Sequence, residues 1–205
     1  MADLDGTSSE GKDKEYFTDV PQVAPNFFLK GSHQYDWGLQ NRLAHIFNPV
    51  SGRTIMLAFD HGYFMGPTTG LERVDQTILP LEPYCDCLML TRGIQRSIIP
   101  ANTQKAIALR ASGGTSMISL GDDWEGEIAG QPATLRRPGY EPLSNEHLAV
   151  DINEAIRLNA SVLAVQVFIG SQYERQSLQN LTNLIDAAAG YGIAVMGVVA
   201  VGRAM

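Results

Sequence analysis

Two titratable side chains stand where a buried segment of the chain ends. Residues 54–59 form a nearly continuous apolar run, which is typical of a strand buried on both faces. Asp60 and His61 follow this run directly and precede a loop rich in glycine, proline and threonine. In α/β sheets and barrels the carboxyl ends of the strands present catalytic groups. A carboxylate and an imidazole there could transfer protons in a reaction. The alternative is structural: Asp60 caps the next turn and His61 is a satisfied surface group.

The segments that must position these groups alternate between two kinds of hydrophobic pattern. The pattern predicts strands at about 54–59, 85–90, 106–109, 162–168 and 193–199, and helices at 36–47, 71–79, 94–99 and 172–189. A further helix is expected from Ser144 or Asn145, with Leu148, Ile152, Ala155 and Ile156 along one face. Strands that alternate with helices imply right-handed βαβ units and a parallel sheet.

The architecture that this alternation favours is a (β/α) barrel. No G-x-G-x-x-G fingerprint follows a strand and no Walker-type loop is present, so a dinucleotide or P-loop site is unsupported. A closed barrel has eight strands and typically about 250 residues. The pattern therefore predicts an α/β chain that carries about the first five βα units of a (β/α)8 TIM barrel.

The chain divides into an arm and one domain. Residues 1–34 have little hydrophobic periodicity and are predicted to be a partly disordered N-terminal arm. Residues 35–205 are predicted to be the incomplete barrel domain. The segment near 115–143 is irregular, and loops of that length are usually functional or inserted. We therefore expect an inserted loop near 115–143.

Composition narrows the class of protein. The net charge of −7 and the pI near 5.0 argue against a nucleic-acid or anionic-membrane partner. No apolar run approaches the ~18 residues of a membrane span, and the polar, acidic N-terminus is unlike a signal peptide. Cys85 and Cys87 lie too close on one strand for an ordinary disulfide, and two buried small residues are favoured over a metal site. These features predict a cytoplasmic protein without a metal site.

Four separated stretches resemble one family. The first spans residues 57–73 and contains Asp60-His61-Gly62, and the others are residues 35–40, 91–94 and 166–174. In this order they are similar to class I aldolases with an Asp-His-Gly motif, related to archaeal fructose-bisphosphate and deoxyribose-phosphate aldolases. Within that group they most resemble the 3-hydroxy-5-phosphonooxypentane-2,4-dione thiolases, which degrade phosphorylated autoinducer-2. The resemblance covers residues from about 30 to 205, except for about 117–143.

The resemblance implies a (β/α)8 TIM barrel that assembles into a homo-oligomer, a decamer in the thiolases. It implies transfer of an acetyl group from the phosphorylated dione to coenzyme A, with release of dihydroxyacetone phosphate. Coenzyme A would be a co-substrate, and no cofactor would be permanently bound. In this reaction Asp60 would transfer protons at the carbon being cleaved and His61 would hydrogen-bond the substrate.

The family also uses a lysine near the end of the sixth strand, which forms a Schiff base, and phosphate-binding loops after the seventh and eighth strands. This sequence ends just past the fifth expected strand, so the resemblance predicts a C-terminally truncated barrel without that lysine. Three of its lysines, Lys12, Lys14 and Lys30, lie in the arm. The fourth, Lys105, precedes the third strand and is expected at the wrong end of the barrel.

Three further residues are candidates for substrate binding. Arg92 and Arg110 follow or end predicted strands and could meet a phosphate or a carboxylate, although a structural ion pair is an equal alternative. Gln166 lies near the end of the fourth strand, at the expected mouth of the barrel, where ordinary packing is the alternative.

Three functions are compatible with these observations. The leading hypothesis is the thiolase reaction on the phosphorylated dione, and a close alternative is a class I aldolase that acts on another sugar phosphate. The third is a non-catalytic remnant or subunit, because the first and fifth strands would each leave an unpaired apolar edge, which invites pairing with a partner.

Overall fold

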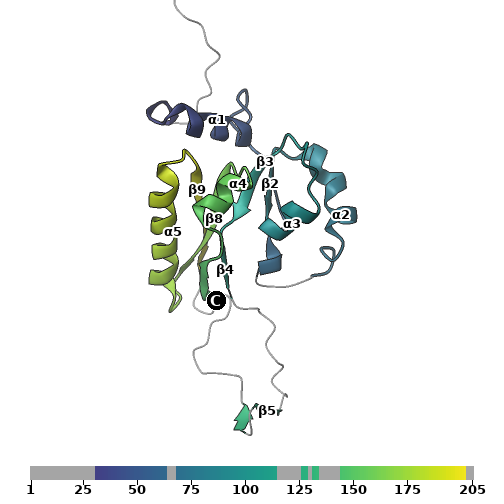
Figure 1. Cartoon of the computed structure of the whole chain (residues 1–205), viewed down its shortest axis with the longest axis vertical. Coiled ribbons are helices and arrows are strands. Elements are labelled where there is room, and N and C mark those ends of the chain that lie inside the picture. Colours follow the sequence, from purple (N-terminus) through teal and green to yellow (C-terminus); the bar gives the residue numbers. More distant parts are fainter. Residues whose placement is uncertain (1–30, 64–67, 115–125, 129–130, 134–143, 202–205) are drawn as a thin grey trace, which may run out of the picture.

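The computed structural model describes residues 31–63, 68–114, 126–128, 131–133 and 144–201. Its centre is one parallel sheet in the order β1-β2-β3-β8-β9. The strands are β1 Met56–Ala58, β2 Cys87–Leu90, β3 Ala106–Arg110, β8 Val162–Ile169 and β9 Ala194–Val201. The sheet curls into part of a cylinder (Figure 1). The structure therefore confirms the predicted incomplete TIM barrel, with all five expected strands paired in parallel.

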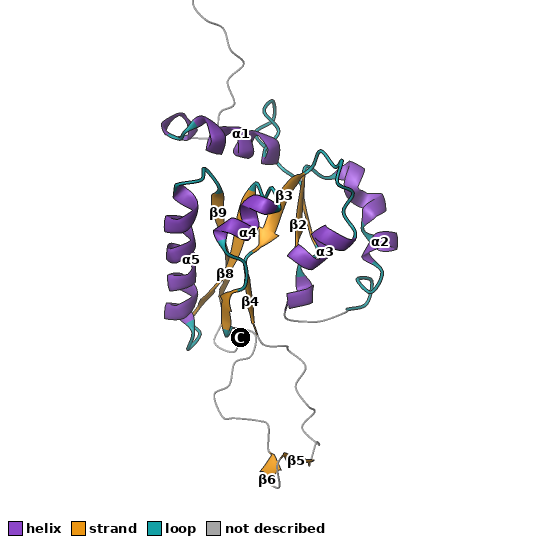
Figure 2. Ribbon diagram, in the orientation of Figure 1, coloured by secondary structure: helices purple, strands orange, loops and turns teal. Residues whose placement is uncertain are grey.

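Helices cover the outer face of this sheet and one of its ends (Figure 2). The α-helices are α1 Trp37–Ile46, α2 Val74–Thr77, α3 Arg92–Ser97, α4 Ile152–Arg157 and α5 Glu174–Ala189. Three 3-10 helices are η1 Ser32–Gln34, η2 His61–Tyr63 and η3 Leu79–Tyr84. The helix expected at 71–79 is thus confined to α2, and η3 continues after it because Pro80 and Pro83 interrupt α-helical hydrogen bonding.

The two faces of the sheet carry two hydrophobic clusters, because side chains alternate along a strand. The outer cluster includes Leu90, Leu109 and Leu163, packed beneath the helices. The inner cluster includes Met89, Ala108 and Ala164, and Ile46 of α1 reaches it at the amino ends of the strands. Continuing the alternation past Ala108 and Ala164 turns Arg110 and Gln166 to the inner face, at the carboxyl ends of their strands.

Local sequence explains the two longest helices. The Asp36 side chain accepts a hydrogen bond from the Leu39 backbone N–H at 2.9 Å and caps α1. In α5 the inward residues Leu184 and Ala188 are buried. Leu178 and Ile185 fit the same apolar stripe in the sequence, yet these residues are 39% and 44% exposed. The buried stripe of α5 is therefore narrower than the sequence pattern predicted.

The predicted start of the fourth helix, at Ser144 or Asn145, is wrong. Residues Glu146–Leu148 form β7, which pairs antiparallel with β4, Ser112–Gly114. The helix begins only at Ile152, where the Asp151 side chain accepts from the Glu154 N–H at 2.8 Å. Leu148 fits a helical stripe in the sequence, but it packs on the outer cluster from a strand.

Two short strands belong to the predicted insertion. They are β5 Gly126–Ile128 and β6 Gln131–Ala133, and they pair antiparallel with each other. The remainder of the expected insertion and most of the expected arm, residues 1–30, lie outside the described residues.

Both cysteines are free and buried, as the sequence predicted. Cys87 is fully buried in β2, and this burial raises the pKa of its thiol to about 12. Burial also raises the pKa of the Cys85 thiol. Within the described ranges no helix is long and apolar enough to cross a membrane, and no His, Cys, Asp and Glu side chains gather into a metal site.

The outer strands of the sheet, β1 and β9, each have a neighbour on one side only among the described residues. On β9 the side chains of Val199 and Val201 are 61% and 70% exposed. The predicted pair of open apolar edges is therefore present in the described part of the chain, and such edges favour pairing with another strand.

Candidate active site

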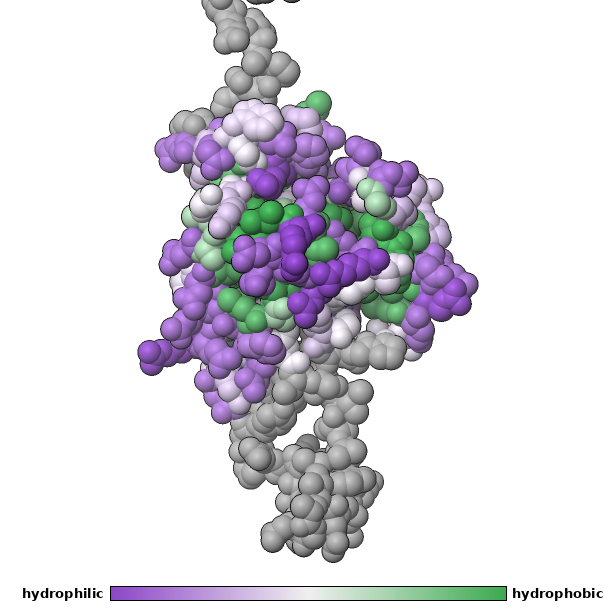
Figure 3. Space-filling model, viewed as in Figure 1, coloured by the Kyte–Doolittle hydropathy of each residue, from purple (hydrophilic) through white to green (hydrophobic). Residues whose placement is uncertain are grey.

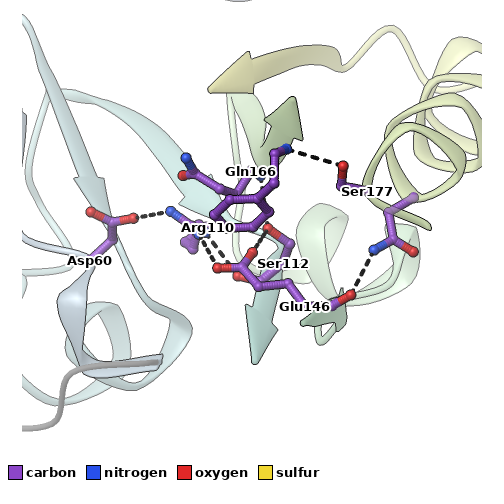
Figure 4. Close-up of polar contacts among 8 residues, drawn as sticks. Asp60, Arg110, Ser112, Glu146, Gln166 and Ser177 are labelled. Carbon is purple, nitrogen blue, oxygen red and sulfur yellow. Dashed lines mark hydrogen bonds and ion pairs between the residues drawn. The ribbon is translucent and has the colours of Figure 1, made fainter. Parts of the chain in front are cut away.

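Arg110 is the centre of a buried polar cluster at the carboxyl ends of the strands (Figure 4). Its side chain is 2% exposed, and three of its nitrogens donate to protein oxygens. Nη1 donates to Asp60 Oδ2 at 2.8 Å and Nη2 to Glu146 Oε1 at 2.7 Å. Nε donates to the Ser112 carbonyl at 2.8 Å. The rigid fork of the guanidinium thus fixes two carboxylates from β7 and from the end of β1.

Both the side-chain carboxylate and the backbone carbonyl of Glu146 accept hydrogen bonds. Its Oε2 accepts a hydrogen bond from Ser112 Oγ at 2.5 Å, and Ser112 Oγ accepts one from the Gln166 backbone N–H at 2.9 Å. The Glu146 carbonyl accepts hydrogen bonds from the Gln176 and Asn180 side chains of α5. The cluster therefore ties β1, β3, β7, β8 and α5 together, as Figure 4 shows.

The charges of this cluster do not cancel. Asp60 and Glu146 are 5% and 2% exposed, and the single guanidinium between them is equally buried. Burying ionised groups is costly unless they are paired and hydrogen-bonded, so Arg110 is needed to keep both carboxylates in the fold. Asp60 uses only Oδ2 for Arg110. Its Oδ1 has no hydrogen-bond partner among the described residues, which leaves one carboxylate oxygen for a reacting group.

His61 is not part of this cluster. It begins η2 and lines a cavity of about 420 Å³ together with Phe59 and Val74. Phe59 belongs to the outer hydrophobic cluster, so this cavity lies on the outer side of β1, whereas the Asp60 side chain binds Arg110 in the buried polar cluster. The two residues that the sequence predicted as a pair therefore face different surroundings.

Arg92 also lies outside the cluster. It is the first residue of α3, and its charge lies near the Tyr63 hydroxyl. Burial raises the pKa of Tyr63, and the Arg92 charge partly opposes this shift. Of the predicted residues, the structure thus brings together Asp60, Arg110 and Gln166, the last through its backbone N–H.

Sequence reasoning missed Glu146 and Ser112. One signal was present: Gly113 and Gly114 lie in β4, shortly after β3, and glycine in a strand often marks a close backbone approach. A Cβ on Gly114 would lie 2.6 Å from the Asn145 carbonyl oxygen. The glycine therefore lets β7 approach β4, and this pairing places Glu146 against Arg110.

Lys105 lies where the sequence predicted, before β3. Its Nζ donates to the Cys85 carbonyl at 2.7 Å, at the amino end of the strands. It is the only lysine among the described residues, so the described part of the rim carries no amine for a Schiff base.

Comparisons with known proteins add a sequence relationship. Searched against protein-family models, the chain matches none. Over its 205 residues it is 49% identical to an uncharacterized aldolase of Pasteurella multocida. It is 48% identical over the same length to 3-hydroxy-5-phosphonooxypentane-2,4-dione thiolases of Yersinia pestis and Yersinia pseudotuberculosis. The chain spans 62% of the length of these relatives.

Solved structures with a similar fold include fructose-bisphosphate aldolases. An archaeal fructose-1,6-bisphosphate aldolase, solved with its catalytic lysine bound to a carbinolamine intermediate, has a TM-score of 0.56 at 22% identity. That match covers 78% of this chain and 56% of the aldolase. A fructose-bisphosphate aldolase from Slackia heliotrinireducens has a TM-score of 0.59 at 13% identity. This match covers 90% of this chain and 57% of the aldolase. At these identities the likeness establishes the fold alone. Over its 205 residues the chain is therefore similar in sequence to the 3-hydroxy-5-phosphonooxypentane-2,4-dione thiolases, and its described residues fold as part of a TIM barrel.

Proposed function

We propose that this chain supplies the first five βα units of an enzyme that transfers an acetyl group from 3-hydroxy-5-phosphonooxypentane-2,4-dione to coenzyme A. The products are acetyl-CoA and dihydroxyacetone phosphate. The observation that carries the proposal is the Asp60 carboxylate, held by Arg110 at the carboxyl ends of the strands, in a chain 48% identical to thiolases of that name.

The chemistry needs a proton carrier at this place. When the carbon–carbon bond next to a carbonyl breaks, the acetyl group passes to the coenzyme A sulfur and a carbanion remains on the phosphorylated fragment. That carbanion must take up a proton. A carboxyl group with one oxygen held by Arg110 and no described partner for the other can donate this proton and then be protonated again by the coenzyme A thiol, and general acid–base catalysis of this kind contributes about 10²- to 10⁴-fold.

The remaining predicted residues receive supporting roles. Arg110 is buried and donates to both Asp60 and Glu146, so we assign it to positioning Asp60 and not to phosphate binding. Arg92, at the start of α3, is the candidate for the substrate phosphate, and Gln166 for a substrate oxygen at the inner face. His61 would reach substrate only from the outer side of β1, on which it lines its cavity.

The same proposal covers the oligomeric state of the enzyme and the lysine that forms the Schiff base. We propose a homo-oligomeric enzyme in the cytoplasm, with a Schiff-base lysine on the later part of the barrel and coenzyme A as co-substrate. A second candidate reaction is aldol cleavage of another sugar phosphate. It is favoured by the relative of Pasteurella multocida that is named an aldolase and is 49% identical.

A hybrid enzyme separates these two reactions. The chain replaces the 62% of the Yersinia pestis thiolase with which it aligns, so that the thiolase supplies the rest of its barrel. We expect the hybrid to form acetyl-CoA from the dione and coenzyme A, and to be trapped by borohydride with substrate bound. Formation of a triose phosphate from fructose 1,6-bisphosphate or deoxyribose phosphate, with no acetyl-CoA from the dione, would favour the aldolase. A folded hybrid without either activity contradicts both proposals.

A further inference from the structure

A basic groove lies at the amino ends of the strands, between α1 and the last residues of α3 and α4. Its volume is about 850 Å³, which is within the range of small-molecule sites. Asp60 and its cluster lie at the other end of the strands, so the groove is not part of the candidate active site. The cationic side chains that line it are Arg42 of α1, Arg96 of α3, Lys105 before β3 and Arg157 of α4.

The lining of this groove is basic, although the chain as a whole is acidic. The chain has a net charge of −7, yet no Asp or Glu is among the residues that line the groove. On the face drawn in Figure 3, strongly hydrophilic side chains gather over α3 and α4 below α1 and are flanked by apolar surface. A local cationic concavity in an acidic protein attracts a small anion, whereas the net negative charge of the chain repels an extended polyanion such as nucleic acid.

The arginines keep donors that the protein does not use. Arg96 and Arg157 each pair through Nη2 with Glu154, whose side chain is 8% exposed. One buried carboxylate thereby holds two guanidiniums side by side. Each guanidinium has five N–H donors, and Nε and Nη1 of both arginines have no acceptor among the described residues. Two neighbouring forks of this kind suit the oxygens of a phosphate group.

The other two cations are fixed by the backbone. Lys105 Nζ donates to the Cys85 carbonyl at 2.7 Å, and Arg42 Nη1 donates to the Gly192 carbonyl at 3.0 Å. These contacts hold each cation at the groove through uncharged acceptors. Asn41, Gln104 and Ser161 add neutral polar groups to the lining.

Cationic side chains often lie near the carbonyl ends of helices, but this preference explains only part of the cluster of cations at the groove. Arg42 binds carbonyls just beyond α5, and Arg96 and Arg157 lie in the last turns of α3 and α4. Glu154 neutralises only one of the four positive charges, so the groove keeps a surplus of positive charge. Lys105 lies outside all three helices and still faces the same cavity.

We propose that this groove binds a small phosphorylated anion, separately from the candidate active site. The phosphate oxygens accept charge-assisted hydrogen bonds from Arg96, Arg157 and Lys105. The exposed Trp37 also lines the groove, and its indole offers an apolar surface for the rest of the ligand. The proposal does not depend on the reaction assigned to the barrel.

Calorimetric titration of the purified chain with inorganic pyrophosphate tests this site. We expect one saturable site whose affinity falls as the salt concentration rises, because salt screens exposed charges. Arg157→Ala and Lys105→Ala should each weaken pyrophosphate binding by about tenfold or more, since each removes a charge-assisted hydrogen bond. The Arg157 side chain is 72% exposed, so its removal should leave the fold intact, as a thermal melt would verify.

Arg73→Ala is the matched control, since it removes the same charge from an exposed ion pair with Asp75 that lines the other cavity. It should change pyrophosphate affinity by less than about twofold, as is usual for a surface charge away from a site. Absence of saturable pyrophosphate binding to the wild-type chain would overturn the proposal. Equal weakening by Arg73→Ala and by both groove variants would overturn it too.

Discussion

In the hybrid enzyme, Asp60→Asn lowers kcat for acetyl-CoA formation by about 10²- to 10⁴-fold, the usual contribution of a general acid–base group. Asparagine has the size of aspartate and can still accept the hydrogen bond from Arg110 Nη1, so the cluster should keep its geometry. Asparagine has an NH₂ group in place of the second carboxylate oxygen, so it cannot carry a proton to the reacting carbon. Steady-state kinetics with the dione and coenzyme A measure the change, and KM for the dione should move much less than kcat.

Asp75→Asn serves as the control for this variant. Asp75 is an exposed carboxylate on α2 that pairs with Arg73. Its removal should leave kcat within about twofold of the unmodified hybrid, as surface substitutions usually do. If Asp60→Asn retained more than about a tenth of the rate, Asp60 would not be the proton carrier, because such a group contributes at least about 10²-fold.

The second large effect is on stability. Arg110→Met should lower the free energy of unfolding of the chain by about 3–5 kcal/mol, the usual cost of removing one partner from a buried ion pair. Methionine fills part of the volume but leaves Asp60 and Glu146 buried without a counter-ion. Denaturant unfolding followed by circular dichroism measures the loss.

Two further variants decide whether the charges cause this loss. Arg73→Met removes an arginine from an exposed ion pair and should leave the unfolding midpoint nearly unchanged. Adding Asp60→Asn and Glu146→Gln to Arg110→Met removes the uncompensated charges and should restore much of the stability. If the triple variant were less stable than Arg110→Met alone, the destabilisation would come from lost packing and not from charge.

Much of the scaffold could be predicted because its signals are local. Continuous apolar runs marked the five strands, and the abrupt change after Phe59 marked the carboxyl end of β1. The alternation of strands and helices then required a parallel order, which the structure shows. Asp60 could be singled out for the same reason, since it is the first charged residue after a buried strand.

The cluster around Asp60 could not be predicted in full because its contacts cross long distances in sequence. Arg110 had two equal interpretations, and only the position of Glu146, 36 residues later, shows that it is in a buried ion pair. The side chains from 148 to 156 fit a helical stripe, so the pattern concealed β7 and Glu146 with it. His61 was paired with Asp60 because they are adjacent, whereas in the structure Asp60 binds Arg110 and His61, the first residue of η2, lines a separate cavity.

The most direct test of the central claim is a crystal structure of the hybrid with dihydroxyacetone phosphate bound. We predict that the ligand lies at the carboxyl ends of the strands. Its hydroxyl or carbonyl oxygen should lie within about 3.2 Å of Asp60 Oδ1, which is hydrogen-bond distance. Arg110 should still bridge Asp60 and Glu146 in that structure. A ligand bound elsewhere on the barrel, with Asp60 contacting only Arg110, would contradict the account.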